Sequence, residues 1–301
     1  MDFIDQLKAR FRSGSMLVRV IYINVGVFLV LRIAAVMAVL FGTSADWLLT
    51  LVEVPSHWQQ VLFRPWTVLT YMVAHYDVLH ILFNMLWLYW LGQMFLDYYT
   101  PRQFTGLYVL GGIGGAAAYV LAGSFLPAFR YGQSYLIGAS ASILAIVVAV
   151  AVTAPRRPIG LFLIGEVQLK WVAIVTLLID FLGIEAGNAG GHIAHLGGAL
   201  VGLAYGLNMR RGTDVTSHIN SIIDRLSSLF KDKRRGVGQP VGGRAYHYSP
   251  SEPIDTKPQK PTEAEIDVIL DKIKRSGYGA LSNEERDTLF RASSRRTQSE
   301  K

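Results

Sequence analysis

The sequence contains no cysteine, and charged residues make up only 17% of its 301 residues. Without cysteine, the chain can form neither a disulfide bond nor a thiolate site, whether that site is a nucleophile or a metal centre. The low charge accompanies 51% hydrophobic residues, a balance that is unusual for a soluble globular domain. The composition therefore predicts an integral membrane protein.

Most of the apolar residues lie in blocks between residues 17 and 209. A membrane-spanning helix needs roughly 20 predominantly apolar residues to cross a hydrocarbon core about 30 Å thick. The blocks predict six such helices, at residues 20–41, 78–99, 104–126, 135–154, 171–186 and 189–209. We expect an all-α membrane protein, in which a bundle of six transmembrane helices is followed by a small helical cytoplasmic tail.

The chain divides by composition into five segments. They are a lead-in at residues 1–16, the membrane domain at 17–210, a basic amphipathic segment at 211–235, a linker rich in glycine, proline and serine at 236–261, and a helical hairpin at 262–295. Two capping-box patterns, Thr262 with Glu265 and Ser282 with Glu285, indicate the helical hairpin. Because so short a hairpin buries only a small core, we expect it to bind a cytoplasmic partner. Inside the membrane domain, residues 155–170 alternate between apolar and polar side chains, which predicts a short β-hairpin.

The distribution of basic residues predicts the orientation of the bundle, because cytoplasmic loops of membrane proteins carry an excess of lysine and arginine. With the N-terminus inside, the inner segments hold Lys8, Arg10, Arg12, Arg19, Arg102, Arg156, Arg157, Lys170, Arg210 and Arg211. The outer loops hold only Arg64 and Arg130. We therefore expect both termini in the cytoplasm. The net charge of +7 is then a topology signal that also attracts anionic lipid, and no nucleic-acid partner is expected.

Three clusters of polar residues fall in the predicted spans, where polar side chains are costly and need a partner or a function. They are His75, His80 and Asn84 at the second span, Ser140 after Gly138 on the fourth, and His192 and His195 before Gly198 and Gly202 on the sixth. Each cluster alone is a weak signal, because membrane serines often bond to their own backbone and paired small residues often serve only close helix packing. The two histidines could bind a metal or bridge helices. No carboxylate accompanies them in an HExxH pattern and there is no cysteine, so we expect no metal.

The clusters are more informative together than apart. At a rise of 1.5 Å per residue, Ser140 lies roughly 8 Å and His195 roughly 10 Å below the outer surface. The small residues near them let the fourth and sixth helices approach closely. A hydrogen bond between serine and histidine is therefore predicted at that depth.

These patterns, HxxxxHxxxN, GxS and HxxGxxxG on the second, fourth and sixth spans, resemble those of the rhomboid intramembrane serine proteases. The resemblance covers residues 17–210 and implies a serine endopeptidase in which Ser140 is the nucleophile and His195 the base. His195 is preferred over His192 because Gly198 and Gly202 follow it at the offsets found in the family. A dyad suits this chain, because no acidic residue stands beside the motifs that carry Ser140 and His195.

The resemblance also implies the roles of the other residues. The oxyanion would be held by the Ser140 amide with His80 and Asn84, while His75, Gly138, Gly198 and Gly202 would support the site. No cofactor is expected. The substrates would be segments of membrane proteins that enter sideways from the lipid, with the short fifth span as the gate. The tail resembles an appendage of bacterial members, which implies a bacterial inner membrane.

Two other functions fit part of the sequence. A catalytically inactive relative could bind and escort membrane helices without cutting them, but such proteins usually lack the serine or the histidine, and this chain has both. A transporter could use the same polar residues as a proton path. It would show paired repeats with broken helices, which the sequence lacks.

Overall fold

The computed structural model describes residues 3–129, 134–161, 165–185, 187–230 and 263–276. The chain divides into two compact units, Met1–Arg234 and Arg235–Lys301. The first unit is a bundle of helices with two very small sheets. In the second unit, the described residues form the helix α12, Glu263–Ser276.

Six helices of the first unit correspond to the six predicted spans. They are α2 (Met16–Leu40), α6 (Val78–Leu96), α7 (Pro101–Phe125), α8 (Ser140–Thr153), α9 (Leu169–Gly183) and α10 (Ala189–Arg210). Among the described residues, α2, α6 and α7 are long and apolar enough to cross a membrane, and α8 is a shorter apolar helix. The prediction of an all-α helical bundle is therefore confirmed.

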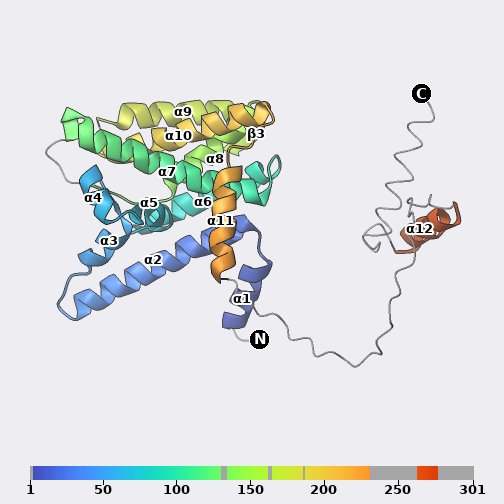
Figure 1. Cartoon of the computed structure of the whole chain (residues 1–301), viewed down its shortest axis with the longest axis horizontal. Coiled ribbons are helices and arrows are strands. Elements are labelled where there is room, and N and C mark those ends of the chain that lie inside the picture. Colours follow the sequence, from blue (N-terminus) through green and yellow to red (C-terminus); the bar gives the residue numbers. More distant parts are fainter. Residues whose placement is uncertain (1–2, 130–133, 162–164, 186, 231–262, 277–301) are drawn as a thin grey trace, which may run out of the picture. The chain divides into compact units, whose positions relative to one another are not determined.

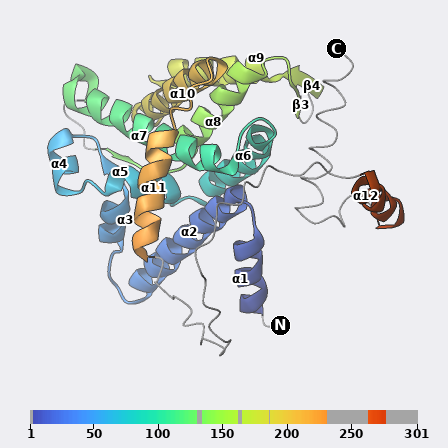
Figure 2. The same ribbon diagram turned by 45° about the vertical axis from the view of Figure 1, so that its right-hand side comes forward.

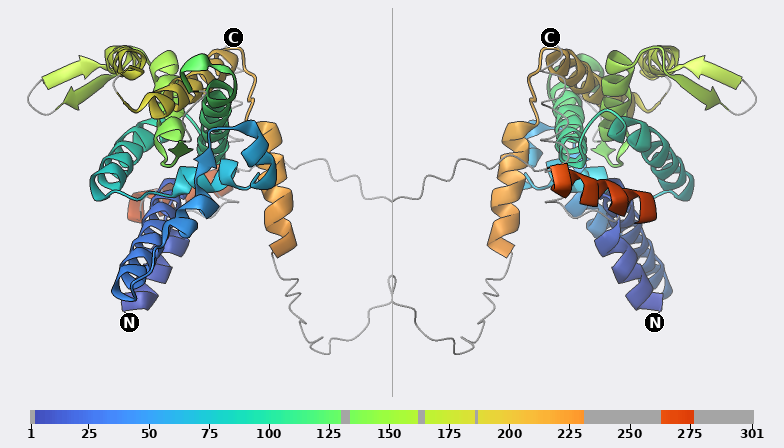
Figure 3. Two further views of the ribbon diagram at one scale, coloured as in Figure 1. Left: turned by 90° about the vertical axis from the view of Figure 1, so that its left-hand side faces the viewer. Right: turned by 90° about the vertical axis from the view of Figure 1, so that its right-hand side faces the viewer.

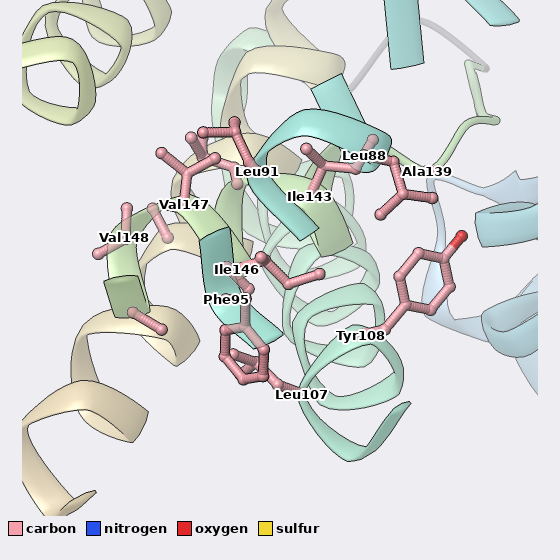
Figure 4. Close-up of a cluster of buried hydrophobic side chains, with 14 of the residues drawn as sticks. Leu88, Leu91, Phe95, Leu107, Tyr108, Ala139, Ile143, Ile146, Val147 and Val148 are labelled. Atoms are coloured by element: carbon pink, nitrogen blue, oxygen red, sulfur yellow. The ribbon is translucent and has the colours of Figure 1, made fainter. Parts of the chain in front are cut away.

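Helix α8 lies at the centre of the bundle, and residues 141–151 along it are all buried. It contacts α6, α7, α9 and α10. Figure 4 shows side chains of α6, α7 and α8 that meet in one apolar cluster, among them Leu88, Phe95, Leu107, Ile143 and Ile146. A helix that is apolar on every side is stable only when neighbours or lipid cover all its faces, which explains the central position of α8.

Glycines on α10 bring this helix into backbone contact with two neighbours. A Cβ atom on Gly198 would lie 2.1 Å from the carbonyl oxygen of Ala141, and one on Gly202 would lie 2.2 Å from that of Ala145. Both carbonyls belong to α8. A Cβ on Gly197 would instead lie 2.6 Å from the Gly114 carbonyl oxygen on α7. In Figures 1 and 2, α9 lies along α10, so that α10 is flanked by α7, α8 and α9.

The connection between α2 and α6 contains short elements. They are α3 (Asp46–Val52), β1 (Val54–Pro55), α4 (Trp58–Phe63), α5 (Thr67–Thr70) and the 3-10 helix η1 (Tyr71–Val73). Trp47, Trp58 and Trp66 along this connection are all exposed, as expected for indoles at a membrane–water interface.

The segment between α7 and α8 begins with the 3-10 helix η2 (Pro127–Phe129) and includes β2 (Tyr135–Leu136), which pairs with β1. The predicted fourth span began at residue 135, whereas α8 begins at Ser140. The backbone just before α8 forms its hydrogen bonds with other parts of the protein. Strand β2 pairs with β1, and the Gly138 amide donates to the Tyr71 carbonyl oxygen at 3.0 Å. These hydrogen bonds within the protein take the place of helical ones, in a stretch that the apolar run alone predicts to be helical.

The predicted β-hairpin is confirmed by β3 (Pro158–Leu161) and β4 (Gly165–Gln168), which pair in an antiparallel sense. It projects from the bundle next to α9 (Figure 3). At its base Arg157 donates to the Asp97 carboxylate at 2.6 Å and to the Tyr98 hydroxyl at 3.1 Å. The hydrogen bond to Tyr98 and the charge of Asp97 raise the pKa of Arg157 above its ordinary value.

The ends of the first unit carry the helices α1 (Phe3–Ser13) and α11 (Ser217–Phe230). Arg102 at the start of α7 forms an ion pair with Asp224 of α11. Gly106 of α7 leaves room for Thr216 and Asn220, whose side chains would meet a Cβ at that position. In the second unit α12 falls within the predicted helical hairpin, while the predicted linker 236–261 and the second helix of the hairpin lie outside the described residues.

Candidate active site

Ser140 and His195 meet where α8 and α10 cross. The Ser140 Oγ lies 2.7 Å from the His195 Nε2, a distance typical of a strong hydrogen bond. Both side chains are half-buried. The glycine contacts one and two turns along α10 hold the two helices at the separation that this bond needs.

Ser140 is the first residue of α8, so its backbone amide belongs to the first turn of a helix. Amides in the first turn have no partner within the helix and point toward its positive end. Gly138, two residues earlier, has φ +121, a conformation that L side chains rarely adopt. The turn therefore places the amide and the hydroxyl of Ser140 together at the start of α8.

His80 and Asn84 lie one helical turn apart on α6, facing that space. The ring of His80 lies against Gly138, because a Cβ there would be 2.7 Å from the His80 Cε1. Asp77 caps α6 by accepting from the His80 amide at 2.9 Å. The buried Asn84 uses one amide N–H to donate to the His80 carbonyl oxygen at 2.9 Å, which leaves its second N–H for another acceptor.

His75 lies behind this group and is fully buried. Its Nε2 accepts from the Ala139 amide at 3.3 Å, and its ring packs edge-on against His80 with centroids 5.1 Å apart. The segment that carries His75 is held by hydrogen bonds from Tyr71 to the Gly112 carbonyl oxygen and from Tyr108 to the Met72 carbonyl oxygen, each 2.6 Å. Every residue that the sequence predicted for the site is therefore close to Ser140 or to the contacts that position it.

One residue of this site was missed, and the expectation that no acidic residue accompanies the motifs was wrong. Asp180 of α9 places its Oδ1 2.7 Å from the His195 Nδ1 and 2.8 Å from the His192 Nδ1. Asp180 is 12 residues before His192 and lies on a different helix, so motif spacing could not place it. The available signal was the cost of a carboxylate inside a predicted span, which requires a partner.

Asp180 also supplies a carboxylate beside the two histidines, and the lack of one was part of the reason for expecting no metal. Ligand atoms of Asp180, His192 and His195 all lie within 4.8 Å of one another, as in sites that use two histidines and a carboxylate. In the geometry observed, however, both Nδ1 atoms are at hydrogen-bonding distance from the carboxylate oxygen. An imidazole nitrogen that donates a proton cannot also coordinate a metal.

Two cavities meet at the Ser140–His195 pair. A cavity of about 420 Å³ lies between α6, α8 and α9, and its walls are mostly apolar, with Phe83, Trp87 and Leu144 among them. A second cavity, of about 640 Å³, is formed largely by connecting segments and includes Tyr119, Ser134 and Asn188. His80, Asn84, Ser140 and His195 line both.

The arrangement is that of a helical membrane protein with a serine–histidine pair at the end of an internal helix. Residues 62–212, half of the chain, match the Rhomboid domain, and the chain belongs to the rhomboid family. The match confirms the resemblance to the rhomboid family that the sequence motifs indicated. Residues 257–295 match a family of unknown function, DUF6576.

Two curated relatives share part of the chain. RHOMBOID-like protein 12, mitochondrial, from Arabidopsis thaliana is 29% identical over 157 residues, which are 48% of this chain and 47% of the relative. Presenilin-associated rhomboid-like protein A, mitochondrial, from Danio rerio is 32% identical over 135 residues, which are 44% of this chain and 34% of the relative. The chain thus spans less than half the length of each.

Proposed function

We propose that this protein is a serine endopeptidase that cleaves transmembrane or membrane-adjacent segments of other membrane proteins. The observation that carries the proposal is the 2.7 Å contact between the Ser140 Oγ and the His195 Nε2, at the junction of an apolar cavity and a more polar one. A serine with only a packing role would not need an imidazole at this distance. A protein that only binds helices would not need it either.

In the proposed reaction the Ser140 Oγ attacks the scissile carbonyl carbon while its proton passes to the His195 Nε2. The Oγ–C bond forms, and the carbonyl electron pair moves to the oxygen. When this oxyanion collapses, the C–N bond breaks and the imidazolium gives its Nε2 proton to the leaving amine. A water molecule then hydrolyses the acyl-serine ester with His195 again as base, which releases the carboxyl product and restores Ser140.

The transient oxyanion would be held by the Ser140 amide at the start of α8, with His80 and Asn84 as side-chain donors. A helix N-terminus favours negative charge, and donors fixed before the reaction stabilise the charge without reorganising. The free N–H of Asn84 suits this role. His75 would support the site through the Ala139 amide.

The two cavities suit the two reactants. The apolar cavity between α6 and α9 is the proposed lateral entrance for a substrate helix from the lipid, with α9 as the gate. The cavity at the connecting segments is the proposed route for water. Because a helical substrate has its carbonyls engaged in its own hydrogen bonds, cleavable segments should contain residues that weaken the helix.

We further propose that both termini are cytoplasmic, because Lys170, Arg210 and the other basic residues of the short loops concentrate on one side. The bacterial inner membrane expected from the tail stays a prediction, and the names of both relatives place those proteins in mitochondria. Cysteine labelling from either side of a sealed membrane would test the topology cleanly, since the chain has no cysteine of its own.

The test of the protease uses purified protein with a membrane-anchored fluorescent substrate. Intact protein should cleave, whereas Ser140→Ala and His195→Ala should not. Ser142→Ala is the matched control, because it makes the same change two residues further along α8, where the hydroxyl is buried against Gly112 of α7. Cleavage that persists in Ser140→Ala would refute the proposal. Inactivity of the intact protein toward a broad substrate set would favour the escort function.

We also propose that the membrane domain at 17–210 carries the activity and that the segment at 262–295 binds a cytoplasmic partner, to which 236–261 links it. The separate family match at 257–295 supports a distinct role for this segment. Deletion of 236–301 should preserve hydrolysis of the fluorescent substrate and change which proteins are processed in cells. Unchanged processing would count against a partner.

A further inference from the structure

Asp180 is a buried carboxylate on α9, the helix that corresponds to the predicted fifth span. Its side chain is only 7% exposed, and its Oδ1 contacts both His192 and His195. Its other oxygen, Oδ2, is buried without a hydrogen-bond partner among the described residues. A buried carboxylate is costly unless donors compensate for its lost hydration, so the contacts to the two imidazoles account for its presence there.

The contact with His195 determines where the proton of that ring lies. A neutral imidazole carries one N–H, and the other nitrogen is an acceptor. Asp180, when ionised, can only accept, so it holds the proton on the His195 Nδ1. The Nε2, which faces the Ser140 Oγ at 2.7 Å, is then the lone-pair nitrogen that a general base requires.

We propose that Asp180 is the positioning residue of a Ser140–His195–Asp180 relay, which differs from the dyad implied by the resemblance. The inference rests on the proposed function of Ser140 and His195 and adds a third member to it. Asp180 touches no reacting atom. It orients the imidazole of His195, fixes its tautomer and stabilises the imidazolium, and it stays ionised while the proton moves between Ser140, the His195 Nε2 and the leaving amine.

The relay links catalysis to the position of α9. Ser140 is on α8, His195 on α10 and Asp180 on α9, the helix that walls the apolar cavity. Helices α9 and α10 are in close contact near the site. A Cβ on Gly183 of α9 would lie only 2.6 Å from the Nε2 of His192 on α10. The relay is therefore complete only while α9 is packed on α10, and an outward movement of α9 that admits a substrate would interrupt it.

His192 has a different role from His195 in this arrangement. Its Nδ1 donates to the same Oδ1 at 2.8 Å, whereas among the described residues the ring that bonds to Ser140 is that of His195. This hydrogen bond from His192 stabilises the buried negative charge of Asp180 and helps to fix the orientation of the carboxylate. Loss of His192 should weaken the support for Asp180 without changing which nitrogen of His195 is protonated.

The kinetic test compares Asp180→Asn with His192→Gln in the same detergent and with the same substrate. In serine hydrolases with a triad, replacing the acid lowers kcat by roughly 10⁴-fold, and here Asp180→Asn should lower kcat by roughly 10³- to 10⁴-fold with KM little changed. His192→Gln should lower kcat far less. Unchanged kcat in folded Asp180→Asn, while Ser140→Ala is inactive, would overturn the relay and leave the protease in place.

A second measurement needs no variant at position 180. Nitrogen-15 NMR of histidine-labelled intact protein reports the tautomer of each neutral imidazole, and the His195 signal is assigned by its loss in His195→Gln. The relay predicts a protonated Nδ1 and an unprotonated Nε2 for His195. The reverse tautomer would overturn it even if Asp180→Asn did not fold, and the result stands whether or not the intact protein cleaves the chosen substrate.

Discussion

The contact between Gly198 and α8 provides a direct test of whether helix packing determines the distance between Ser140 and His195. In Gly198→Ala the new methyl group would lie 2.1 Å from the Ala141 carbonyl oxygen, whereas real Cβ contacts are essentially never below 3.0 Å. The obstacle is backbone, which cannot rotate away as a side chain can. Helices α8 and α10 must therefore separate by at least about 0.9 Å near this point.

That separation acts directly on the Ser140–His195 pair, which lies one turn away. If the helices move apart as rigid bodies along the line of this hydrogen bond, the Oγ–Nε2 distance would grow from 2.7 Å to about 3.6 Å, which is no longer a hydrogen bond. A misplacement of roughly 1 Å can cost about 100-fold in rate, or about 2.7 kcal/mol in the activation free energy. We expect this loss in kcat, measured with the fluorescent substrate.

The neighbouring residue provides the matched control. In Gly197→Ala the same methyl group on the same helix would meet α7, at 2.5 Å from the Ala118 Cβ and 2.6 Å from the Gly114 carbonyl oxygen. Both variants should lower the unfolding temperature in detergent, but only Gly198→Ala should separate serine from histidine. Equal loss of kcat in the two variants, or full activity in Gly198→Ala, would refute the idea that this contact sets the catalytic distance.

Three further predictions concern single contacts around the site. Asn84→Ala removes a proposed oxyanion donor and should lower kcat by roughly 100- to 1,000-fold with little effect on KM; steady-state kinetics would show this, and an unchanged kcat would exclude Asn84 from the oxyanion site. His75→Leu leaves the buried Ala139 amide without its acceptor and should lower the free energy of unfolding by about 1–3 kcal/mol, seen as a lower melting temperature; unaltered stability would mean that this bond is not formed. Arg157→Ala removes an exposed ion pair with Asp97, so its effect on stability should stay below about 1 kcal/mol and kcat should not change; a large loss of activity would give the hairpin base a role in catalysis.

Much of the bundle could be predicted because its signals are local. Apolar runs long enough to cross a bilayer marked α2, α6 and α7 directly, and the alternating stretch before α9 marked the β-hairpin. The start of α8 could not be predicted in the same way. Residues 135–139 contain no charged residue and run directly into the apolar helix, but strand pairing with β1 and the bond from Gly138 to Tyr71 satisfy their backbone instead.

The candidate site shows the same division between local and distant information. His80 and Asn84 share a face of one helix and Gly198 follows His195 by three residues, so helical spacing grouped the residues within each span. The resemblance to the family then linked the spans to one another. Asp180 has no such relation to Ser140 or His195. It reaches them only because α9 folds back along α10, and that contact depends on tertiary packing which no pattern of nearby residues records.

The position of Asp180 also explains why a site assembled from three helices can remain ordered in lipid. Helices in a membrane gain little from excluding water, so their association depends on close packing and on polar contacts. Here the glycines of α10 provide the close packing against α8, and the carboxylate of α9 provides the polar contact with α10.

Loss of either contact should affect the same hydrogen bond, that between Ser140 and His195. Because each variant already weakens that bond, the combined variant Gly198→Ala with Asp180→Asn should lose less activity than the product of the two single losses. Fully multiplicative losses would instead show that the two contacts act on separate steps.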